Sequence, residues 1–453
     1  MGPNMSDNIE SIFKAYDVRG RVGTELTDDV AYDIGRAFAD WLPYDGAVAV
    51  GHDMRPDSSR LAARVIDGLR KQGRDVVDVG QITTDMIYFA VGKFDRAGGI
   101  IVTASHNPGE YNGMKFCGRE AVAIGEKSGL FDIRDRVMSQ TFAEVEGQGQ
   151  VQQQDIAEEW IQHVLSFIEV DKLTEMKLAV DAGNGMAGKI FPELEPYVPW
   201  QITEMFFELD GTFPNHEANP LKFETLADMQ ARIKQDGLDG GIAFDGDGDR
   251  ALLVDEQGEV LTGGVMSAML SEYFLQRFPG SNIVYDIRNS RSVPEVIVEN
   301  GGQPALERVG HSFLKQKMRE VDAPFGGEAS GHFYFRDNWY ADSGLIAAVI
   351  GIYVATLRGQ KLSEIREHFT RYAAIQETNF PVDDKDAALK RIASAFPDVE
   401  PNYMDGITLD FQDGSWVNVR PSNTESLLRL NAEANTQAQL DALVEKVHGL
   451  IQG

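Results

Sequence analysis

Short runs of apolar residues recur along the chain, and each run ends at a polar loop. Helical patterns, in which apolar residues return every three to four positions, separate these runs. The alternation predicts repeated βα units built around mostly parallel sheets. The runs expected to form buried strands are residues 47–50, 100–102, 178–180, 242–244 and 283–285.

Three of the passages from strand to loop resemble one another. Residues 98–105 begin with Gly-Gly and continue through a buried run into a small polar loop, residues 240–245 repeat this arrangement, and residues 325–330 end a third such block. The economical interpretation is three similar domains, each of which gives one loop to a shared cleft.

The end of the chain has a different pattern. After Pro381, a helix-like run precedes three strand-like runs in quick succession, at residues 407–409, 416–419 and 427–430, and an amphipathic helix over residues 437–450. Strands in quick succession followed by a helix predict a small α+β domain. The expected domains are residues 1–150, 151–256, 257–370 and 371–453.

Length and charge narrow the class of protein. A chain of 453 residues is too long for a single core. The net charge of −29 disfavours binding to nucleic acid or to anionic membranes, so an anionic substrate requires a local basic pocket. The apolar runs are short and the N-terminus shows no leader pattern, so no membrane partner is expected. The single cysteine, Cys117, allows no internal disulfide, and a cytoplasmic location is therefore expected.

The most informative loop follows the run 242–244 and reads Asp-Gly-Asp-Gly-Asp-Arg. Asp245, Asp247 and Asp249 alternate with glycines, which let the backbone curl at positive φ. Carboxylates at this spacing fit a hard cation such as Mg²⁺, which prefers oxygen ligands. A tight Asp/Gly hairpin turn without an ion uses the same residues and remains an alternative. An EF-hand calcium loop is excluded, because its sixth position is glycine and here it is Arg250.

A second loop places a serine and a histidine directly after a buried strand. Ser105 and His106 lie among Asn-Pro and Asn-Gly turn signals, and Lys115 follows soon after. An exposed serine and histidine on a rigid loop form a candidate covalent site, whereas ordinary turn chemistry is the alternative. These residues alone leave both interpretations open.

Two further loops carry polar groups suited to a phosphorylated sugar. In residues 327–332, Glu328 and Ser330 lie two positions apart and project together from an extended loop, which suits hydrogen bonding to neighbouring sugar hydroxyls. Residues 420–424 combine a guanidinium, hydroxyls and an amide, and they resemble a phosphate cradle. Each loop taken alone is equally well explained as a capped turn.

One motif points towards nucleotide binding but is weak. Residues 183–188 read Gly-x-Gly-x-x-Gly after a strand, and with Lys189 they nearly spell a phosphate-binding loop. Ile190 stands where that loop requires a serine or threonine. The pattern therefore favours a glycine turn that packs a helix onto its strand.

Together, and in this order, the four polar loops resemble the α-D-phosphohexomutase superfamily, most closely its phosphomannomutase/phosphoglucomutase branch. The resemblance extends from Tyr-Asp-Val-Arg-Gly at residues 16–20 to Arg429. It implies three related α/β domains with mixed, mostly parallel sheets and a smaller C-terminal α+β domain around a central cleft. In chain order these domains carry the phosphoserine, metal, sugar-binding and phosphate-binding loops.

The resemblance also implies an activity and its central residues. A phosphoryl group moves reversibly between O1 and O6 of a hexose phosphate, of mannose or glucose, through a phosphoserine and a hexose 1,6-bisphosphate that also acts as activator. Ser105 is the implied phosphoserine, and Mg²⁺ is held by Ser105, Asp245, Asp247 and Asp249. His106 belongs to the catalytic group.

General acid/base work is assigned to Lys115 and His311. Arg288 stands where some relatives carry lysine, and because an arginine is a poor proton carrier it is assigned to phosphate or ring binding. The implied substrate-binding residues are Tyr16, Arg19, Arg250, Arg288, His311, Glu328, Ser330, His332, Arg420, Ser422, Asn423, Thr424 and Arg429.

Three other functions compete with this one. Phosphohexosamine mutases generally carry glutamine where this chain has Ala329, which counts against them. A phosphatase with an aspartate nucleophile shares the spacing of Asp245 and Asp247, but such enzymes usually have threonine or valine in place of Asp249. A regulatory protein that binds a metal or a sugar phosphate without catalysis is the third. The expected partners are hexose phosphates, and the expected assembly is a monomer or homodimer.

Overall fold

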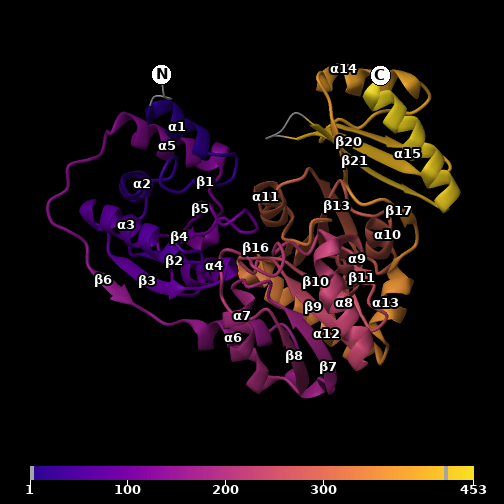
Figure 1. Ribbon diagram of the computed structural model, residues 1–453, viewed down its shortest axis with the longest axis horizontal. Helices are drawn as coiled ribbons and strands as arrows, with labels where there is room; N and C mark the ends of the chain where they lie inside the picture. Colours follow the sequence, from indigo (N-terminus) through magenta and orange to yellow (C-terminus); the bar gives the residue numbers. More distant parts are fainter. Residues whose placement is uncertain (1–4, 423–426) are drawn as a thin grey trace. The chain divides into compact units, whose positions relative to one another are not determined.

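The computed structural model describes residues 5–422 and 427–453, and the chain divides into two compact units. The first unit comprises Met1–Thr262 with Ser330–Ser363, and the second comprises Gly263–Ala329 with Glu364–Gly453. The chain therefore leaves the first unit after Thr262, returns to it at Ser330 and leaves it again after Ser363. Figure 1 shows the helices and strands of both units.

The N-terminal part of the first unit is a six-stranded mixed sheet with helices on both faces. Its elements are α1 (Met5–Ile12), β1 (Val18–Arg21), α2 (Asp28–Trp41), β2 (Val48–His52), α3 (Ser58–Lys71), β3 (Val76–Gln81), α4 (Thr84–Lys93), β4 (Gly98–Val102), β5 (Tyr111–Gly118), α5 (Leu130–Ser139) and β6 (Val151–Gln153). The strand order is β1-β5-β4-β2-β3-β6, in which β4, β2 and β3 are parallel and β5 is antiparallel to β4. A Cβ on Gly98 would contact Phe38 of α2, and one on Gly99 would contact Val91 of α4, so α2 and α4 cover opposite faces.

Helix α2 illustrates how local sequence fixes an element. Thr27 caps it, because its hydroxyl accepts a hydrogen bond from the backbone N–H of Val30 at 3.3 Å. Asp28 and Asp29 lie in the first turn, where the positive end of the helix dipole favours acidic groups. The apolar side of the helix, which includes Ile34, is buried in the core that it shares with the strands of the sheet.

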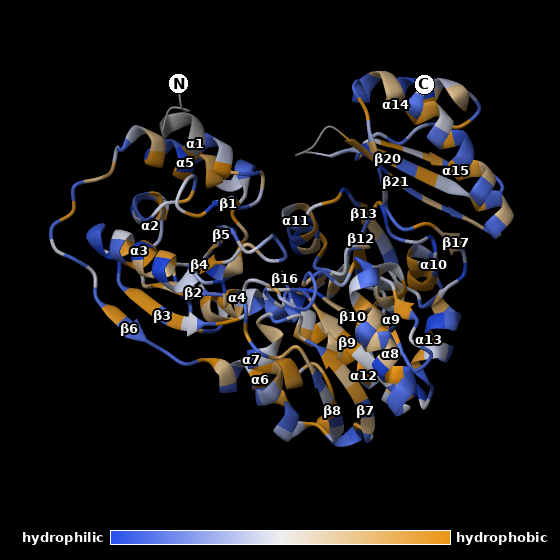
Figure 2. Cartoon of the chain, in the orientation of Figure 1, coloured by the Kyte–Doolittle hydropathy of each residue, from blue (hydrophilic) through white to orange (hydrophobic). Residues whose placement is uncertain are grey.

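The rest of the first unit is built around a five-stranded sheet with the order β11-β10-β9-β7-β8. The elements of this sheet and its helices are α6 (Ala157–Leu165), β7 (Met176–Asp181), α7 (Ala187–Leu194), β8 (Trp200–Met205), α8 (Ala227–Asp236), β9 (Gly240–Phe244), β10 (Ala251–Asp255) and β11 (Val260–Leu261). The returning segment adds α12 (Gly344–Arg358) and the antiparallel pair of β15 (Phe333–Phe335) and β16 (Ala341–Asp342), which are not strands of this sheet. Strands β7, β8 and β9 are parallel, whereas β10 is antiparallel to β9. Every residue of β9 and β10 is buried, and both strands are largely apolar (Figure 2).

The second unit begins with a parallel α/β arrangement. Its elements are α9 (Gly263–Arg277), β12 (Asn282–Asp286), α10 (Ser292–Glu299), β13 (Gln303–Glu307), α11 (His311–Val321), β14 (Phe325–Gly327) and, at its boundary, α13 (Leu362–Phe369). Strand β12 pairs in parallel with both β13 and β14.

An antiparallel sheet with two helices completes the second unit. Its elements are β17 (Ala373–Ala374), β18 (Thr378–Pro381), α14 (Lys385–Ala395), β19 (Ile407–Asp410), β20 (Trp416–Pro421), β21 (Leu427–Ala434) and α15 (Gln437–Gln452). The strand order is β17-β21-β20-β19, and β18 also pairs with β21. Ile392 of α14 and Val447 of α15 share one buried core with Val417 and Val419 of β20.

The predicted fold class is confirmed. All five apolar runs expected as strands are strands, namely β2, β4, β7, β9 and β12, and the C-terminal part is α+β. The pairs β4–β5 and β9–β10 are antiparallel, which makes both sheets of the first unit mixed. Among residues 5–422 and 427–453, no single helix is long and apolar enough to cross a membrane; only α12 and α13 taken as a pair reach that length and composition.

Candidate active site

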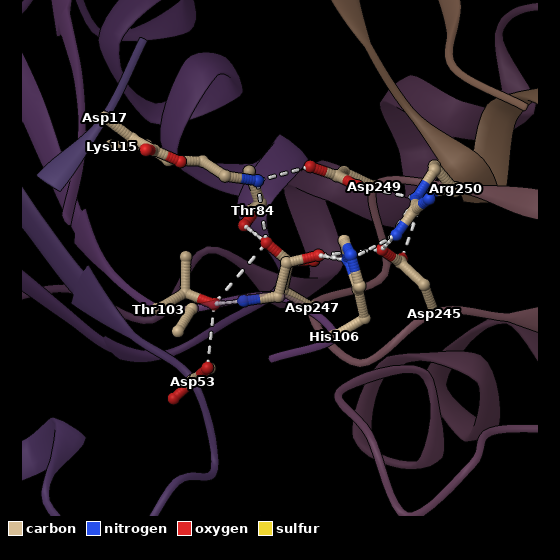
Figure 3. A network of polar contacts seen from close by, with 12 residues as sticks. Asp17, Asp53, Thr84, Thr103, His106, Lys115, Asp245, Asp247, Asp249 and Arg250 are labelled. Carbon is tan, nitrogen blue, oxygen red and sulfur yellow. Dashed lines mark hydrogen bonds and ion pairs between the residues drawn. The ribbon is translucent and has the colours of Figure 1, made fainter. Parts of the chain in front are cut away.

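Two hairpin loops meet in the first unit. The serine loop, residues 103–110, joins β4 to β5, and the acidic loop, residues 245–250, joins β9 to β10. A Cβ on Gly246 would lie 2.6 Å from the carbonyl oxygen of Ser105, so only glycine permits this approach. The Ser105 hydroxyl donates to Asp245 Oδ2 at 3.0 Å. Two loops predicted separately from the sequence thus form a single site (Figure 3).

The carboxylates of the acidic loop are buried and point towards one another. Asp245, Asp247 and Asp249 are 0%, 0% and 2% exposed, and one ligand atom from each lies within 4.8 Å of the others. The Oδ1 atoms of Asp247 and Asp249 have no hydrogen-bond partner among the described residues. Burying carboxylate oxygens without partners is costly, and a hairpin turn alone gives no reason for it. The loop therefore fits a hard divalent cation with oxygen ligands.

Lys115 supplies part of the countercharge to this loop. Its ammonium donates to Asp247 Oδ2 at 2.9 Å and to Asp249 Oδ2 at 2.6 Å (Figure 3). Burial disfavours the charged amine, but the two carboxylates outweigh burial and raise the pKa of Lys115 well above its ordinary value. Burial also disfavours the charged form of Asp245 and raises its pKa to about 7, although Arg250 opposes the shift. Three carboxylates thus face two cations, and a divalent cation would more than balance the one negative charge that remains.

Arg250 connects the acidic loop to the histidine of the serine loop. Its Nε donates to Asp245 Oδ2 at 2.9 Å, and its Nη2 lies 2.7 Å from His106 Nδ1. A guanidinium has only donors, so His106 Nδ1 accepts this bond. Burial, reinforced by Arg250, holds the pKa of His106 well below its ordinary value. His106 is therefore neutral, and its Nδ1, which accepts from Arg250, lies 3.2 Å from the oxygen of the Ser105 hydroxyl.

Other expected residues of the first unit lie around the same loops. Arg19 Nε donates to Asp17 Oδ2 at 2.7 Å, and its Nη1 donates to the Asn107 side chain in the serine loop. His332 Nδ1 lies 2.9 Å from Asp342 Oδ2 and 3.9 Å from Asp249 Oδ1. The remaining expected residues of this unit, Tyr16 and Ser330, are half-buried.

In the second unit, Arg288 holds the acid of the predicted sugar-binding loop. Its Nε donates to Asp286 Oδ2 at 2.7 Å, and its Nη2 donates to Glu328 Oε2 at 3.1 Å. Glu328 is 3% exposed, and Asp286 at the end of β12 is fully buried. His311, an expected acid/base residue, is the first residue of α11 in this unit.

The described members of the predicted phosphate-binding set lie on or next to the antiparallel sheet of the second unit. Arg420 of β20 and Arg429 of β21 stand directly opposite each other across the strand pair. The backbone N–H of Ser422 donates to the carbonyl oxygen of Leu427 at 2.9 Å, which continues this pairing. The other two residues of the predicted loop, Asn423 and Thr424, lie outside the described residues.

Comparison with known protein families gives four matches in chain order. They are the phosphoglucomutase/phosphomannomutase alpha/beta/alpha domain I over residues 10–144, domain II over residues 158–258, domain III over residues 262–372 and the C-terminal domain over residues 377–450. The chain belongs to the phosphoglucomutase/phosphomannomutase family.

Relatives within the family match along nearly the whole chain. Phosphohexose mutases of Xanthomonas campestris pv. campestris (strain B100) are 40% identical over 97% of this chain and 99% of their own length. The phosphomannomutase of Salmonella montevideo is 38% identical over 93% of this chain and 94% of its own. The crystal structure of a phosphoglucomutase/phosphomannomutase family protein from Burkholderia thailandensis is 32% identical, has a TM-score of 0.89 and covers 99% of this chain and 97% of its own. The chain is therefore an isomerase of the phosphosugar mutase class.

The family and the enzyme class predicted from the four loops are thus confirmed, whereas the roles of individual residues and the domain boundaries remain predictions. One sequence-based expectation is wrong. The serine of the covalent site was expected to be exposed, but Ser105 is only 3% exposed. The sequence around the serine gave no sign of this, because the covering groups come from the acidic loop and from a distant arginine.

That arginine is Arg55, which sequence reasoning missed. Its guanidinium donates to the carbonyl oxygens of Ser105 at 2.7 Å, Asn107 at 2.6 Å and Pro108 at 3.0 Å, and so holds the serine loop in shape. Thr84 was missed as well; its hydroxyl donates to Asp247 Oδ2 at 2.6 Å. A signal for Arg55 existed, because Asp-Met-Arg follows a buried strand as the four recognised loops do. Thr84, at the start of α4, offered no such signal.

The glycine motif at residues 183–188 forms a turn between a strand and a helix. It leads from β7 into α7, and the backbone N–H of Met186 donates to the carbonyl oxygen of Gly246 at 2.9 Å. Lys189 donates to the carbonyl oxygen of Gln81 at 2.8 Å. The turn thus leads directly from strand to helix and supports the acidic loop.

A buried acid near the site gives a prediction about stability and pH. Asp85 of α4 is fully buried, and Ser343 Oγ donates to its Oδ2 at 2.6 Å. Burial raises the pKa of Asp85 to about 8, only partly opposed by hydrogen bonds from Ser343 and Thr83. Between its ordinary pKa and about 8, the folded state holds a proton that the unfolded state has lost, so stability falls as pH rises. Over this window the free energy of unfolding falls by about 1 kcal/mol per pH unit.

We expect Asp85→Asn to lose less stability than the wild type on going from about pH 5.5 to about pH 7.5, because the amide has no proton to release. The measurement is the thermal midpoint of both proteins at both pH values. Asp29→Asn is the control, since Asp29 is 88% exposed. Equal pH slopes for the wild type and Asp85→Asn would contradict this account of Asp85.

Proposed function

We propose that the protein is a phosphohexose mutase that moves a phosphoryl group between O1 and O6 of mannose and glucose phosphates through phosphorylated Ser105. The observation that carries the proposal is the hydrogen bond of 3.0 Å between the Ser105 hydroxyl and Asp245, in a loop with buried carboxylate oxygens that lack protein partners. The hydroxyl that would carry the phosphoryl group therefore lies next to the candidate cation site. The families that match in sequence and the mutases among the relatives support the same activity.

The transfer divides into two symmetrical steps. In the first, the bond between phosphorus and Ser105 Oγ breaks while phosphorus forms a bond to the free hydroxyl oxygen of the hexose phosphate, and that hydroxyl loses its proton. The product is a hexose 1,6-bisphosphate. In the second step the other phosphate returns to Ser105 Oγ, and the oxygen it leaves regains a proton. The net result is isomerisation, with Ser105 phosphorylated again.

The acidic loop stabilises the group in transit. Mg²⁺ held by Asp245, Asp247 and Asp249 with one phosphoserine oxygen would supply positive charge to the transferring phosphoryl group. Arg250 donates to Asp245 and contacts His106, and so fixes the loop beside Ser105. Asp245 accepts the hydrogen bond of the Ser105 hydroxyl, and Arg55 fixes the backbone of the serine loop, so these residues orient the serine oxygen.

Proton transfer is assigned to Lys115 and His311. The carboxylates of Asp247 and Asp249 raise the pKa of Lys115, so the amine carries a proton at neutral pH. We assign to it the protonation of the departing oxygen. His311, on α11, is proposed as the proton acceptor. Arg288 contacts Glu328, which agrees with a role in binding rather than in proton transfer.

Sugar and phosphate are held by different groups. Glu328 and Ser330, with Tyr16 and His332, are proposed to bind hydroxyls, and Arg19 is proposed to complete the pocket. The phosphate that does not move is assigned to Arg420, Ser422, Asn423, Thr424 and Arg429. The bisphosphate has to turn around between the two steps, so the sugar-binding groups need hydroxyls that are accessible in both orientations.

We expect both mannose and glucose phosphates to be converted, with a hexose 1,6-bisphosphate as activator. Glu328 and Ser330 are the only strongly hydrogen-bonding side chains in the stretch 327–331, too few to recognise every hydroxyl of the ring. One hydroxyl left unrecognised limits discrimination between the two sugars to about 1–3 kcal/mol. Glu328→Ala should then lower kcat/KM for both sugars by similar factors, about 10- to 100-fold, because the lost hydrogen bonds are common to both.

The experiment measures kcat/KM for mannose 1-phosphate, glucose 1-phosphate and glucosamine 1-phosphate side by side, with Mg²⁺ and a trace of glucose 1,6-bisphosphate. Glu320→Ala, an exposed change on α11, is the control. Conversion of neither mannose nor glucose phosphate would refute the proposed function. Mannose and glucose differ only in the orientation of the hydroxyl at C2. Strict selectivity of the wild type for one of the two sugars, or a Glu328→Ala protein that loses only one activity, would show that this hydroxyl is recognised.

A further inference from the structure

A buried carboxylate lies among the arginines of the second unit. Glu377, between β17 and β18, accepts hydrogen bonds from Arg420 Nη2 at 2.8 Å, Arg429 Nη1 at 3.1 Å and Asn431 Nδ2 at 3.1 Å. Arg288 Nη1 lies 3.9 Å from the same carboxylate. Three guanidinium groups from separate strands and loops therefore converge on one acid.

The two strand arginines carry like charges at facing positions, and Glu377 bridges them. Arg420 and Arg429 are directly opposite across β20 and β21, and like charges at such positions repel. Their Nε atoms are buried and have no hydrogen-bond partner among residues 5–422 and 427–453, so each guanidinium keeps an unused donor. Such an arrangement is typical of a site that receives an anion with several acceptor oxygens.

Glu377 fills part of that site with a permanent negative charge. Burial opposes the charge, but Arg420 and Arg288 outweigh burial and lower the pKa of Glu377 to about 2, so the carboxylate is ionised at neutral pH. The side chain of Glu377 is 24% exposed and that of Arg429 is 30% exposed, so a ligand can reach the cluster from solvent. The side chain of Arg420 is 8% exposed.

We infer that Glu377 is a built-in counter-ion that competes with substrate phosphate for Arg420 and Arg429 and so keeps the phosphate anchor weak enough to release. The inference rests on the proposed function, in which these arginines hold the phosphate that does not move. Each catalytic cycle requires that anchor to bind one phosphate, let it go and bind the other. Without Glu377, Arg420 and Arg429 would hold a phosphate dianion too tightly for this exchange.

Arg288 connects the counter-ion to the sugar-binding loop. It donates to Glu328 at 3.1 Å while its other terminal nitrogen faces Glu377. When phosphate displaces Glu377 from Arg420, the Glu377 carboxylate is free to pair with Arg288. The hydrogen bond from Arg288 to Glu328 is then weakened. Glu377 is thus a positioning residue for both ends of the substrate.

The test is Glu377→Gln, which keeps the size of the side chain and removes its charge. We expect this variant to bind inorganic phosphate and glucose 1-phosphate about tenfold more tightly than the wild type in calorimetric titrations of the full-length protein, because one repelling charge is gone. With glucose 1-phosphate as substrate, KM should fall and kcat should fall with it, because release becomes slow. Glu445→Gln, an exposed change on α15 that also removes one negative charge, should leave both constants unchanged.

Binding that is unchanged or weaker in Glu377→Gln would overturn the inference and make Glu377 a structural support of the arginines. Should Glu377→Gln fail to fold, Glu377→Asp serves instead, because it moves the charge away from the guanidinium groups. Phosphate affinity above that of the wild type is expected for Glu377→Asp, and an equal or lower affinity overturns the inference. Phosphate titration needs no turnover, so a wild type that binds phosphate but converts no sugar phosphate would count against the proposed function alone.

Discussion

Ser105→Ala is expected to lower kcat by on the order of 10⁴-fold or more, the scale of loss when a covalent nucleophile is removed. The fold should survive, because the serine loop is held by Arg55 through backbone carbonyl oxygens and Asp245 keeps its bond from Arg250 at 2.9 Å. The measurement is steady-state turnover of glucose 1-phosphate, together with the thermal midpoint of each protein.

Ser139→Ala is the matched control for this change. Ser139 is an exposed serine at the end of α5, in the same sheet domain, and its loss should alter neither turnover nor stability. Full activity in Ser105→Ala would remove Ser105 from the reaction. A Ser105→Ala protein that unfolds would show that the hydroxyl stabilises the junction of the two loops more than its hydrogen bonds imply.

Asp247→Asn is expected to cripple Mg²⁺-dependent turnover while leaving the binding of sugar phosphate largely intact. The Oδ1 atom of Asp247 is buried without a partner, and we assign it to the cation. A catalytic metal is worth several kcal/mol, which corresponds to a loss on the order of 10²- to 10³-fold at a fixed Mg²⁺ concentration. The phosphate-binding arginines are in the second unit and keep their charges.

The measurement is turnover as a function of Mg²⁺ concentration, with glucose 1-phosphate binding measured in parallel. Asp239→Asn is the control, because Asp239 is an exposed acid just before β9, on the same hairpin. We expect the Mg²⁺ concentration at half-maximal rate to rise for Asp247→Asn only. The same Mg²⁺ dependence in Asp247→Asn and the wild type would contradict the assignment of the acidic loop to the metal.

Much of the fold could be predicted because local sequence determines it. A buried run such as β9 is recognisable from its apolar residues and its flanking glycines, and the acidic loop follows it directly in the chain. The same holds for β4 and the serine loop. Helix α2 begins with a capping threonine and two acids, which is a purely local signal.

The parts that could not be predicted depend on contacts between distant segments. Arg55 reaches Ser105 from 50 positions away, and Thr84 reaches Asp247 from 163 positions away. The burial of Ser105 follows from those contacts and not from its own loop. Glu377 carries no motif at all. Its importance appears only when β20 and β21 bring two arginines and an asparagine around it and Arg288 approaches from the loop after β12.

The central claim is that Ser105 accepts and donates the phosphoryl group, and one measurement tests it most directly. Unphosphorylated protein is mixed with glucose 1,6-bisphosphate and Mg²⁺, quenched, digested and analysed by peptide mass spectrometry. We predict one phosphoryl group per chain, located on Ser105, and its loss when excess glucose 1-phosphate is added before the quench. No phosphoryl group on Ser105, or one on Asp245 instead, would contradict the account.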